Sequence, residues 1–203
     1  MFRKIHFYGI RPSFRRFLAD SLLIILSVLF ALFINEWRDS IKDKKRTEIV
    51  LGNIKMELQT NKEITERLIA YHQKVVDNMK AVSPDSLPNT FFKGKQFYLY
   101  DVAPDGVLQE LHKDIAWEAA KQENITAKID FATSKVVFEA YRQQELVYTT
   151  IFKLINLMNE REIQRIELVE ESYIVMVKLF TELKSQEETL LFRYNNALEK
   201  LSS

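Results

Sequence analysis

The longest apolar stretch of the chain covers residues 17–34, eighteen positions whose single charge is Asp20. A helix needs roughly 20 apolar residues, and at least about 17, to cross the hydrocarbon core of a bilayer. Trp37 follows directly, and Phe17 stands at the start, as aromatic residues do at membrane interfaces. This pattern predicts a transmembrane helix over residues 17–36.

A cleaved signal peptide is the alternative interpretation of this stretch. Such a peptide has a shorter apolar core and ends in small residues of the Ala-x-Ala kind. Here the apolar run ends in Ala31-Leu-Phe-Ile-Asn-Glu-Trp37, which is bulky. The sequence therefore favours an uncleaved anchor.

The number of Lys and Arg residues is the same on both sides of the segment, so this count alone does not predict its orientation. Residues 1–16 hold five Lys or Arg, and residues 38–46 hold five more. No acidic residue precedes Asp20, and moving positive charge outward costs about 2.3 kcal/mol per charge per 100 mV. We expect residues 1–16 to be a basic cytoplasmic tail and residues 38–203 to be periplasmic, with the anchor in the inner membrane.

Residues 37–82 contain no Pro, and Gly52 is their only Gly. Apolar or weakly polar residues recur at alternating intervals of three and four, which is a heptad stripe. The pattern predicts a long heptad helix that continues the membrane helix directly. His72 lies in the stripe, and we interpret it as a half-buried seam residue rather than as a ligand or a pH switch. The stripe consists of Leu51, Ile54, Leu58, Asn61, Thr65, Leu68, His72, Val75 and Met79.

Residues 83–106 hold three of the four Pro and two of the four Gly of the chain. Ser83–Asn89 should form an irregular connection. Aromatic residues around Gly94 favour a small β-hairpin. We expect these aromatic residues to cap one end of a helical bundle, and the alternative is an exposed binding patch with the neighbouring lysines. They are Phe91, Phe92, Phe97, Tyr98 and Tyr100.

The last part of the chain, residues 107–203, has neither Gly nor Pro and predicts a helical bundle. Asp105 is a candidate cap for a first helix, with Leu111 and Ile115 on its inner face. Asp130 is a candidate cap for the next helix.

From Ile166 to Leu201, eleven positions alternate at intervals of three and four, and ten of them are apolar or aromatic. Such a stripe requires a packed partner helix. A stripe from Val147 to Met158 has another phase, so residues 130–201 form either two helices with a turn near Asn156–Asn159 or one helix with a stutter.

Composition excludes several classes of function. The chain has 29 Lys and Arg against 28 Asp and Glu, which argues against nucleic-acid binding by bulk charge. Cysteine is absent, which excludes disulfides, thiolate metal sites and a cysteine nucleophile. The three histidines are far apart, and no phosphate-binding or hydrolase motif occurs. We therefore predict no catalytic residues, no metal ligands, no cofactor and no enzymatic activity.

One candidate interface lies on the membrane helix. Asp20, Ser27, Ala31 and Asn35 follow at intervals of seven, four and four and so share one face. Ser27 and Ala31 form a small-xxx-small pair that lets helices approach closely, so a partner membrane helix could dock there. The alternative, which we favour, places Asp20 at headgroup depth, paired with Arg16.

A second set of candidate residues would contact a partner or line a pocket in the bundle. It comprises His72, Phe91, Phe92, Tyr98 and Trp117. For Trp117, a core anchor is the favoured interpretation over a ligand platform.

Four strings of the chain stand out together: Ala31-Leu-Phe-Ile-Asn-Glu-Trp-Arg38, Ala116-Trp-Glu-Ala-Ala120, Ile129-Asp130 and Val136 to Tyr141. Together they resemble a family of uncharacterised, small, single-pass membrane proteins of Gram-negative bacteria, classed as a domain of unknown function. The resemblance covers roughly residues 10–145, and Asp20 departs from it, where an uncharged residue or Glu is expected. It implies a basic tail, one spanning helix and a helical remainder, and it brings no activity or catalytic residues.

The sequence thus predicts an all-α protein. One N-terminal transmembrane helix continues into an elongated antiparallel helical bundle or coiled coil, with an irregular or β-hairpin insertion near 83–106. The predicted function is interaction, as a scaffold or accessory subunit of a membrane assembly. Its partners would be the lipid bilayer and other membrane subunits, or a second copy through the helices, and not nucleic acid. The alternative is a sensor-like, ligand-binding bundle outside the cytoplasm, without enzymatic activity.

Overall fold

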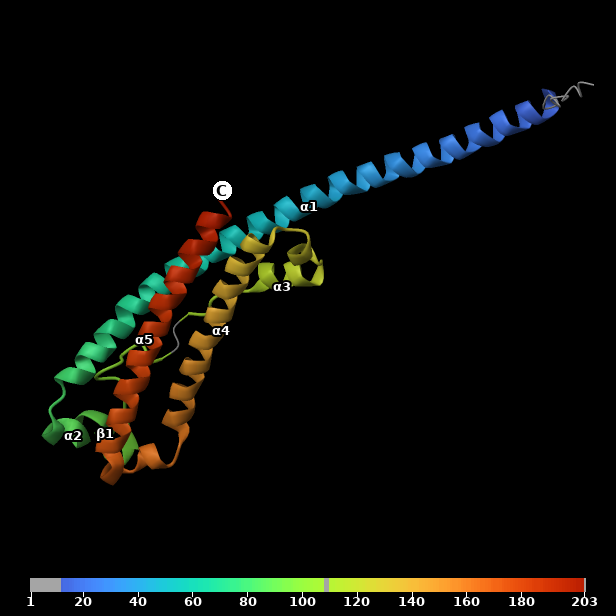
Figure 1. Ribbon diagram of the computed structural model, residues 1–203. Coiled ribbons are helices and arrows are strands. Elements are labelled where there is room, and N and C mark those ends of the chain that lie inside the picture. The colour runs from blue at the N-terminus through green and yellow to red at the C-terminus, as the bar shows by residue number, and fades with distance from the viewer. Residues whose placement is uncertain (1–11, 108–109, 203) are drawn as a thin grey trace, which may run out of the picture. The chain divides into compact units, whose positions relative to one another are not determined.

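The computed structural model describes residues 12–107 and 110–202. The chain divides into two compact units, one ending at Glu48 and the other beginning at Ile49. Helix α1, Pro12–Ala81, contributes to both (Figure 1). The predicted all-α class is confirmed, because every long element is a helix and the strands are two residues each.

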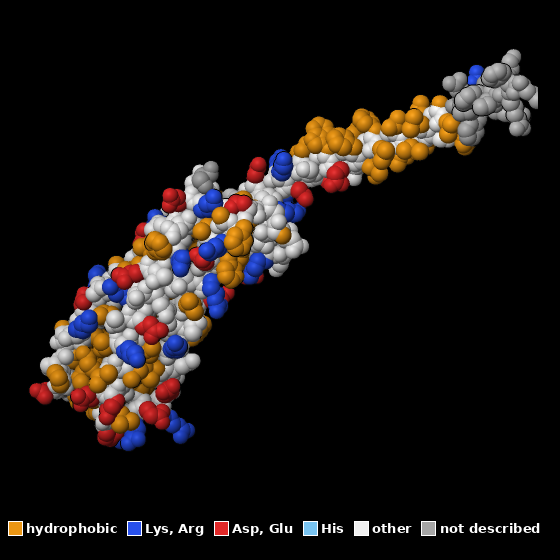
Figure 2. All heavy atoms as spheres, viewed as in Figure 1, with side chains coloured by type: hydrophobic (Ala, Val, Ile, Leu, Met, Phe, Trp, Pro, Cys, Tyr) orange, Lys and Arg blue, Asp and Glu red, His pale blue; other side chains and the backbone are white. Residues whose placement is uncertain are grey.

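The first unit contains the apolar part of α1, and none of the most apolar window of this helix is buried. Figure 2 shows hydrophobic side chains along this part of the helix. By length and composition, α1 can cross a membrane. The predicted direct continuation into the heptad helix is confirmed, since α1 runs unbroken to Ala81.

The second unit is built on three long helices: α1 from Ile49, α4 (Phe131–Asn159) and α5 (Val169–Lys200). Side-chain bonds fix their directions. Glu139 and Thr150 of α4 bond to Arg193 and Gln186 of α5, so α4 and α5 run antiparallel, as Figure 1 also shows. Going along α1, the residue numbers of its hydrogen-bond partners rise in α4, from Tyr141 to Gln144, so α1 and α4 are parallel. The numbers of its partners in α5 fall, from Glu187 to Tyr173, so α1 and α5 are antiparallel.

The predicted stripe of α1 forms the core of this unit. All its members are buried except Leu51, which is half-buried, and the polar seam residues are as buried as the apolar ones. The stripe of α5 is buried from Met176 to Ala197, with Glu187 as its polar member. Helix α4 ends at Asn159, and two short 3₁₀ turns, Glu162–Gln164 and Ile166–Leu168, lead into α5. Residues 130–201 are therefore two helices.

The connection after α1 is more regular than expected. A 3₁₀ turn, Pro84–Ser86, is followed by α2 (Leu87–Phe91), so the prediction of an irregular Ser83–Asn89 is wrong. A proline lies in the first turn of each element, where it has no hydrogen bond to lose and its fixed φ suits the helix.

The predicted β-hairpin is confirmed. Strand β1 (Phe92–Lys93) pairs antiparallel with β2 (Gln96–Phe97) around Gly94, whose φ of 66° suits a residue without a side chain. Phe91 and Phe92 are buried, and the Phe91 ring lies 5.9 Å from that of Tyr173 in α5. These aromatic residues therefore close one end of the bundle.

The helix expected from Asp105 does not form. Gly106 adopts a φ of 74°, and the next helix, α3, begins only at Ile115 and ends at Gln122. Leu111 and Ile115, expected on an inner face, are 59% and 74% exposed. The physical reason is long-range: side chains of α1 and α4 bind the backbone that precedes α3, as described below. Asp130 does cap α4, because its carboxylate accepts from the Thr133 amide.

Candidate functional site

The interior of the bundle holds a column of polar groups in four successive levels along α1. At the first level, Glu57 accepts hydrogen bonds from the Tyr141 hydroxyl at 2.7 Å and from the Ala116 amide at 2.9 Å. Burial and the bond to Glu57 raise the pKa of Tyr141. Trp117 is 6% exposed and stacks on the Tyr141 ring at 5.2 Å. The placement of Trp117 fits the predicted core anchor.

At the second level, Asn61 binds both backbone groups of Lys113. Its Oδ1 accepts from the Lys113 amide at 2.8 Å, and its Nδ2 donates to the Lys113 carbonyl at 2.6 Å. The same Nδ2 lies 3.3 Å from Oε1 of Gln144, which accepts from the Tyr194 hydroxyl at 2.6 Å. The Asn61 side chain therefore pairs with both backbone groups of Lys113, as the backbone of a neighbouring β-strand would.

At the third level, the Thr65 hydroxyl donates its hydrogen to the Asn61 carbonyl. The hydroxyl oxygen of Thr65 can therefore accept a hydrogen bond from Nε2 of His112, which lies 2.8 Å away. The Tyr148 hydroxyl lies 3.3 Å from Nδ1 of the same ring and accepts from the His112 amide. Both ring nitrogens thus have partners when the imidazole is neutral. Burial lowers the pKa of His112 to about 4.

At the fourth level, His72 and Glu187 face each other across α1 and α5. Nδ1 of His72 lies 2.9 Å from both carboxylate oxygens, and neither side chain is exposed. His72 is thus fully buried, which corrects the expectation of a half-buried seam residue. Burial raises the pKa of Glu187, and the hydrogen bond from His72 opposes this shift.

The column joins α1, α4 and α5 through hydrogen bonds between side chains. Apart from Nε2 of His72, its buried polar groups have hydrogen-bond partners, and a misaligned helix would leave several of them without partners. Within the described ranges, no three His, Cys, Asp or Glu side chains gather closely enough to hold a metal ion. The column therefore fixes which residues of α1, α4 and α5 meet.

The outer face of α4 carries exposed aromatic residues. Phe131, Phe138 and Phe152 lie at multiples of seven residues and are 82%, 56% and 56% exposed. Phenylalanine buries a large apolar area when it is covered, so three on one exposed stripe are unusual for a solvated helix face. We call these three residues the α4 Phe stripe.

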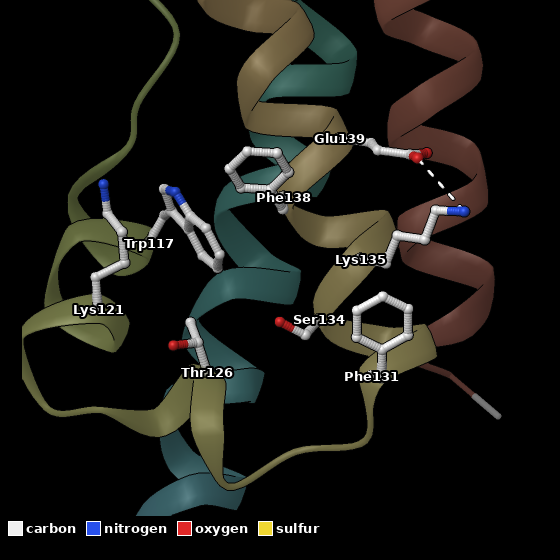
Figure 3. A pocket seen from close by; sticks show the side chains of 8 residues that line it. All are labelled: Trp117, Lys121, Thr126, Phe131, Ser134, Lys135, Phe138 and Glu139. Carbon is white, nitrogen blue, oxygen red and sulfur yellow. Dashed lines mark ion pairs between the residues drawn. The ribbon is translucent and has the colours of Figure 1, made fainter.

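Two grooves flank the α4 Phe stripe. The first has a volume of about 520 Å³ and lies between α3 and α4 (Figure 3). It is lined by Trp117, Lys121, Thr126, Phe131, Ser134, Lys135, Phe138 and Glu139. The second, of about 420 Å³, is lined by Leu111, His112, Glu145, Tyr148, Thr149 and Phe152. In the first groove Lys135 lies 3.8 Å from Glu139, which also pairs with Arg193 at 2.8 Å, and Lys121 pairs with Glu118.

The candidate membrane interface lies in the first unit. Asp20, Ser27, Ala31 and Asn35 are all exposed. The Ser27 hydroxyl donates to the Leu23 carbonyl, and Asn35 bonds within its own helix, so both polar groups already have partners. The placement of Asp20 at headgroup depth, paired with Arg16, stays a prediction.

The second predicted set is not brought into one pocket. Trp117 lies at the level of Glu57, whereas His72 lies fifteen residues further along α1, about 22 Å at 1.5 Å per residue. Phe91 and Phe92 are in the core at the hairpin end. Tyr98 is half-buried, with the Lys93 ammonium 3.7 Å from its ring centre.

Sequence reasoning missed the α4 Phe stripe and the partners of the column. The spacing of Phe131, Phe138 and Phe152 was a readable signal, since it is a second heptad phase on a helix whose core face was already assigned. Glu187 was readable too, as the polar member of an otherwise apolar or aromatic stripe. Its pairing with His72, 115 residues away, carried no local signal.

Comparison of the chain with protein-family models, curated proteins and solved structures finds no match. Function is therefore argued from the residues themselves, and the family resemblance stays a prediction.

Proposed function

We propose that the protein is a membrane-anchored helical interaction protein, a scaffold or accessory subunit of an inner-membrane assembly. Its N-terminus would be cytoplasmic and residues 38–203 periplasmic. The apolar, unburied first part of α1 supports the anchor. The five positive charges of residues 1–16, without an acidic residue among them, support the orientation.

The observation that carries the interaction role is the α4 Phe stripe. Covering a phenylalanine side chain is favourable by about 1.5–3 kcal/mol, so a partner that covers all three gains a substantial free energy. Phe131 and Phe152 are 21 positions apart, about 31 Å along the helix. Spacings of seven and fourteen residues, with Glu145 at the intervening heptad position, suit a partner helix laid along α4.

The stripe can be tested with matched substitutions. Phe138→Glu places a charge on the stripe, and Phe192→Glu makes the same change at a side chain of equal exposure on α5, 58% against 56%. The full chain is purified from its own membranes in a mild detergent, and co-purifying proteins are quantified. We expect one stoichiometric partner with the unmodified chain and with Phe192→Glu, and its loss with Phe138→Glu.

Circular dichroism of both variants serves as the control for folding. A lone chain in every preparation, or a partner retained equally by both variants, would contradict the interaction role.

The orientation has a separate test, because the chain contains no cysteine. Ser202→Cys introduces one thiol near the end of the second unit. In cells with a permeabilised outer membrane, an impermeant maleimide should label it without disruption of the inner membrane. Labelling only after disruption would place the bundle in the cytoplasm.

The alternative function, a ligand-binding bundle, is favoured by the first groove. Its volume of about 520 Å³ and its aromatic lining suit a small apolar ligand. Native mass spectrometry of the full chain released from detergent would reveal such a ligand. A bound small molecule that disappears with Phe138→Glu, without a protein partner, would replace the interaction role by this one.

A further inference from the structure

The buried pair of His72 and Glu187 is an acid and a base sealed in the core. Both side chains are fully buried, and the pair joins α1 to α5. Among the described residues, Nε2 of His72 has no hydrogen-bond partner, so the ring is held through Nδ1 alone. In the described core, each of the two groups has the other as its only contact of opposite charge.

The number of protons on the pair sets its net charge. With one proton in addition to the neutral imidazole hydrogen, the pair is neutral overall, either as imidazolium and carboxylate or as imidazole and carboxylic acid. Removing that proton leaves a buried negative charge, and adding another leaves a buried positive charge. Burying an uncompensated charge is costly, so the closed core favours the state with one proton.

The groups around the pair do not offset a net charge. On α1, the Tyr71 ring meets His72 edge-on at 5.2 Å, and on α5 the Phe180 ring lies 6.1 Å from it. The negative charge of Glu188, also on α5, raises the pKa of Glu187 in addition to burial. The Glu188 carboxylate itself is paired with the Lys184 ammonium at 3.0 Å. The groups nearby on α4 and on the connection are Gln143 and Thr150, which bond to Gln186, and Asp105, whose amide donates to the Tyr71 hydroxyl.

We propose that the folded bundle keeps this single proton on the His72–Glu187 pair above the pH at which a free histidine loses it, so that the stability of the folded bundle falls as the pH rises. Free Glu and His titrate near 4.3 and 6.5. Between these values the folded and unfolded chains carry the same number of protons on the pair, and stability does not depend on pH through it. Above about 6.5 only the folded chain keeps the proton, so stability falls with rising pH.

The test compares thermal midpoints of the full chain in detergent between about pH 6 and about pH 9, on either side of the histidine value. The double variant His72→Leu/Glu187→Leu removes both titrating groups at similar size. The matched control is Thr150→Val/Gln186→Leu, which removes a neutral pair between α4 and α5. We expect the midpoint of the unmodified chain and of the control to fall with pH, and that of the Leu/Leu variant to fall less. An equal fall in all three would overturn the proposal.

A second measurement does not depend on the variants folding. Nitrogen-15 spectra of labelled histidine in the unmodified chain report the protonation of His72 directly. The expected result is that the ring signals stay constant through about pH 6.5 and change only at a higher pH, where the pair releases its proton. A titration of these signals near 6.5, as in a free histidine, would overturn the proposal. Signals that do not change at any pH would show that the pair holds no such proton and would also overturn the proposal.

Discussion

The bond between Asn61 and the backbone of Lys113 is the clearest point at which one side chain decides a local conformation. Asn61→Ala removes both bonds to Lys113, at 2.6 and 2.8 Å, and a weaker contact with Gln144. A hydrogen bond contributes about 1 kcal/mol net, and a buried group left without a partner costs about 1–3 kcal/mol. We expect the free energy of unfolding to fall by about 3 kcal/mol.

The assay is urea unfolding of the full chain in detergent, followed by circular dichroism. Gln59→Ala, two residues earlier on the exposed side of α1, is the control, and an exposed substitution should change stability by no more than about 0.5 kcal/mol. Hydrogen exchange at the Lys113 amide adds a local readout. Exchange should accelerate in Asn61→Ala, because that amide loses its acceptor. Equal stability of the two variants, with unchanged exchange at Lys113, would refute the reasoning.

Two further predictions concern the third level of the column and the hairpin. Because burial lowers the pKa of His112 to about 4 from an ordinary 6.5, its contribution to stability is complete above pH 6.5 and is lost as the pH falls toward 4, a loss of about 3 kcal/mol. Urea unfolding of the unmodified chain and of His112→Gln across that range checks it, and an equal acid loss in both would contradict it. Gly94→Ala places a side chain at a φ of 66° and should lower the free energy of unfolding by about 1 kcal/mol, measured against Lys95→Ala; no difference between these two variants would show that the turn carries no such strain.

Much of the helical architecture could be predicted because the apolar residues of each long helix recur at intervals of three and four. The stripe through Leu58 and Val75 marks a core face in α1 without knowledge of its partner. The failed helix after Asp105 shows the limit of that logic. The conformation before α3 is decided by Asn61, which is 52 residues from Lys113 in the sequence, and no local pattern reports such a bond.

The candidate site was harder to predict for a related reason. Phe138 and Val137 are apolar neighbours in the sequence, and the packed structure shows that Phe138 is 56% exposed whereas Val137 is fully buried. The pairing of His72 with Glu187 also needed the register of α1 against α5. Periodicity indicates which faces are apolar, but it does not indicate which of them remain uncovered.

The four levels of the polar column also restrict how such a bundle could change its length. One residue inserted into α1 between Asn61 and His72 would turn the following residues by about 100° and take His72 away from Glu187. Seven inserted residues would restore the angle but displace His72 along the axis by about 10 Å. Related sequences of different length should therefore gain or lose whole heptads in all three long helices together, with the polar residues kept opposite one another.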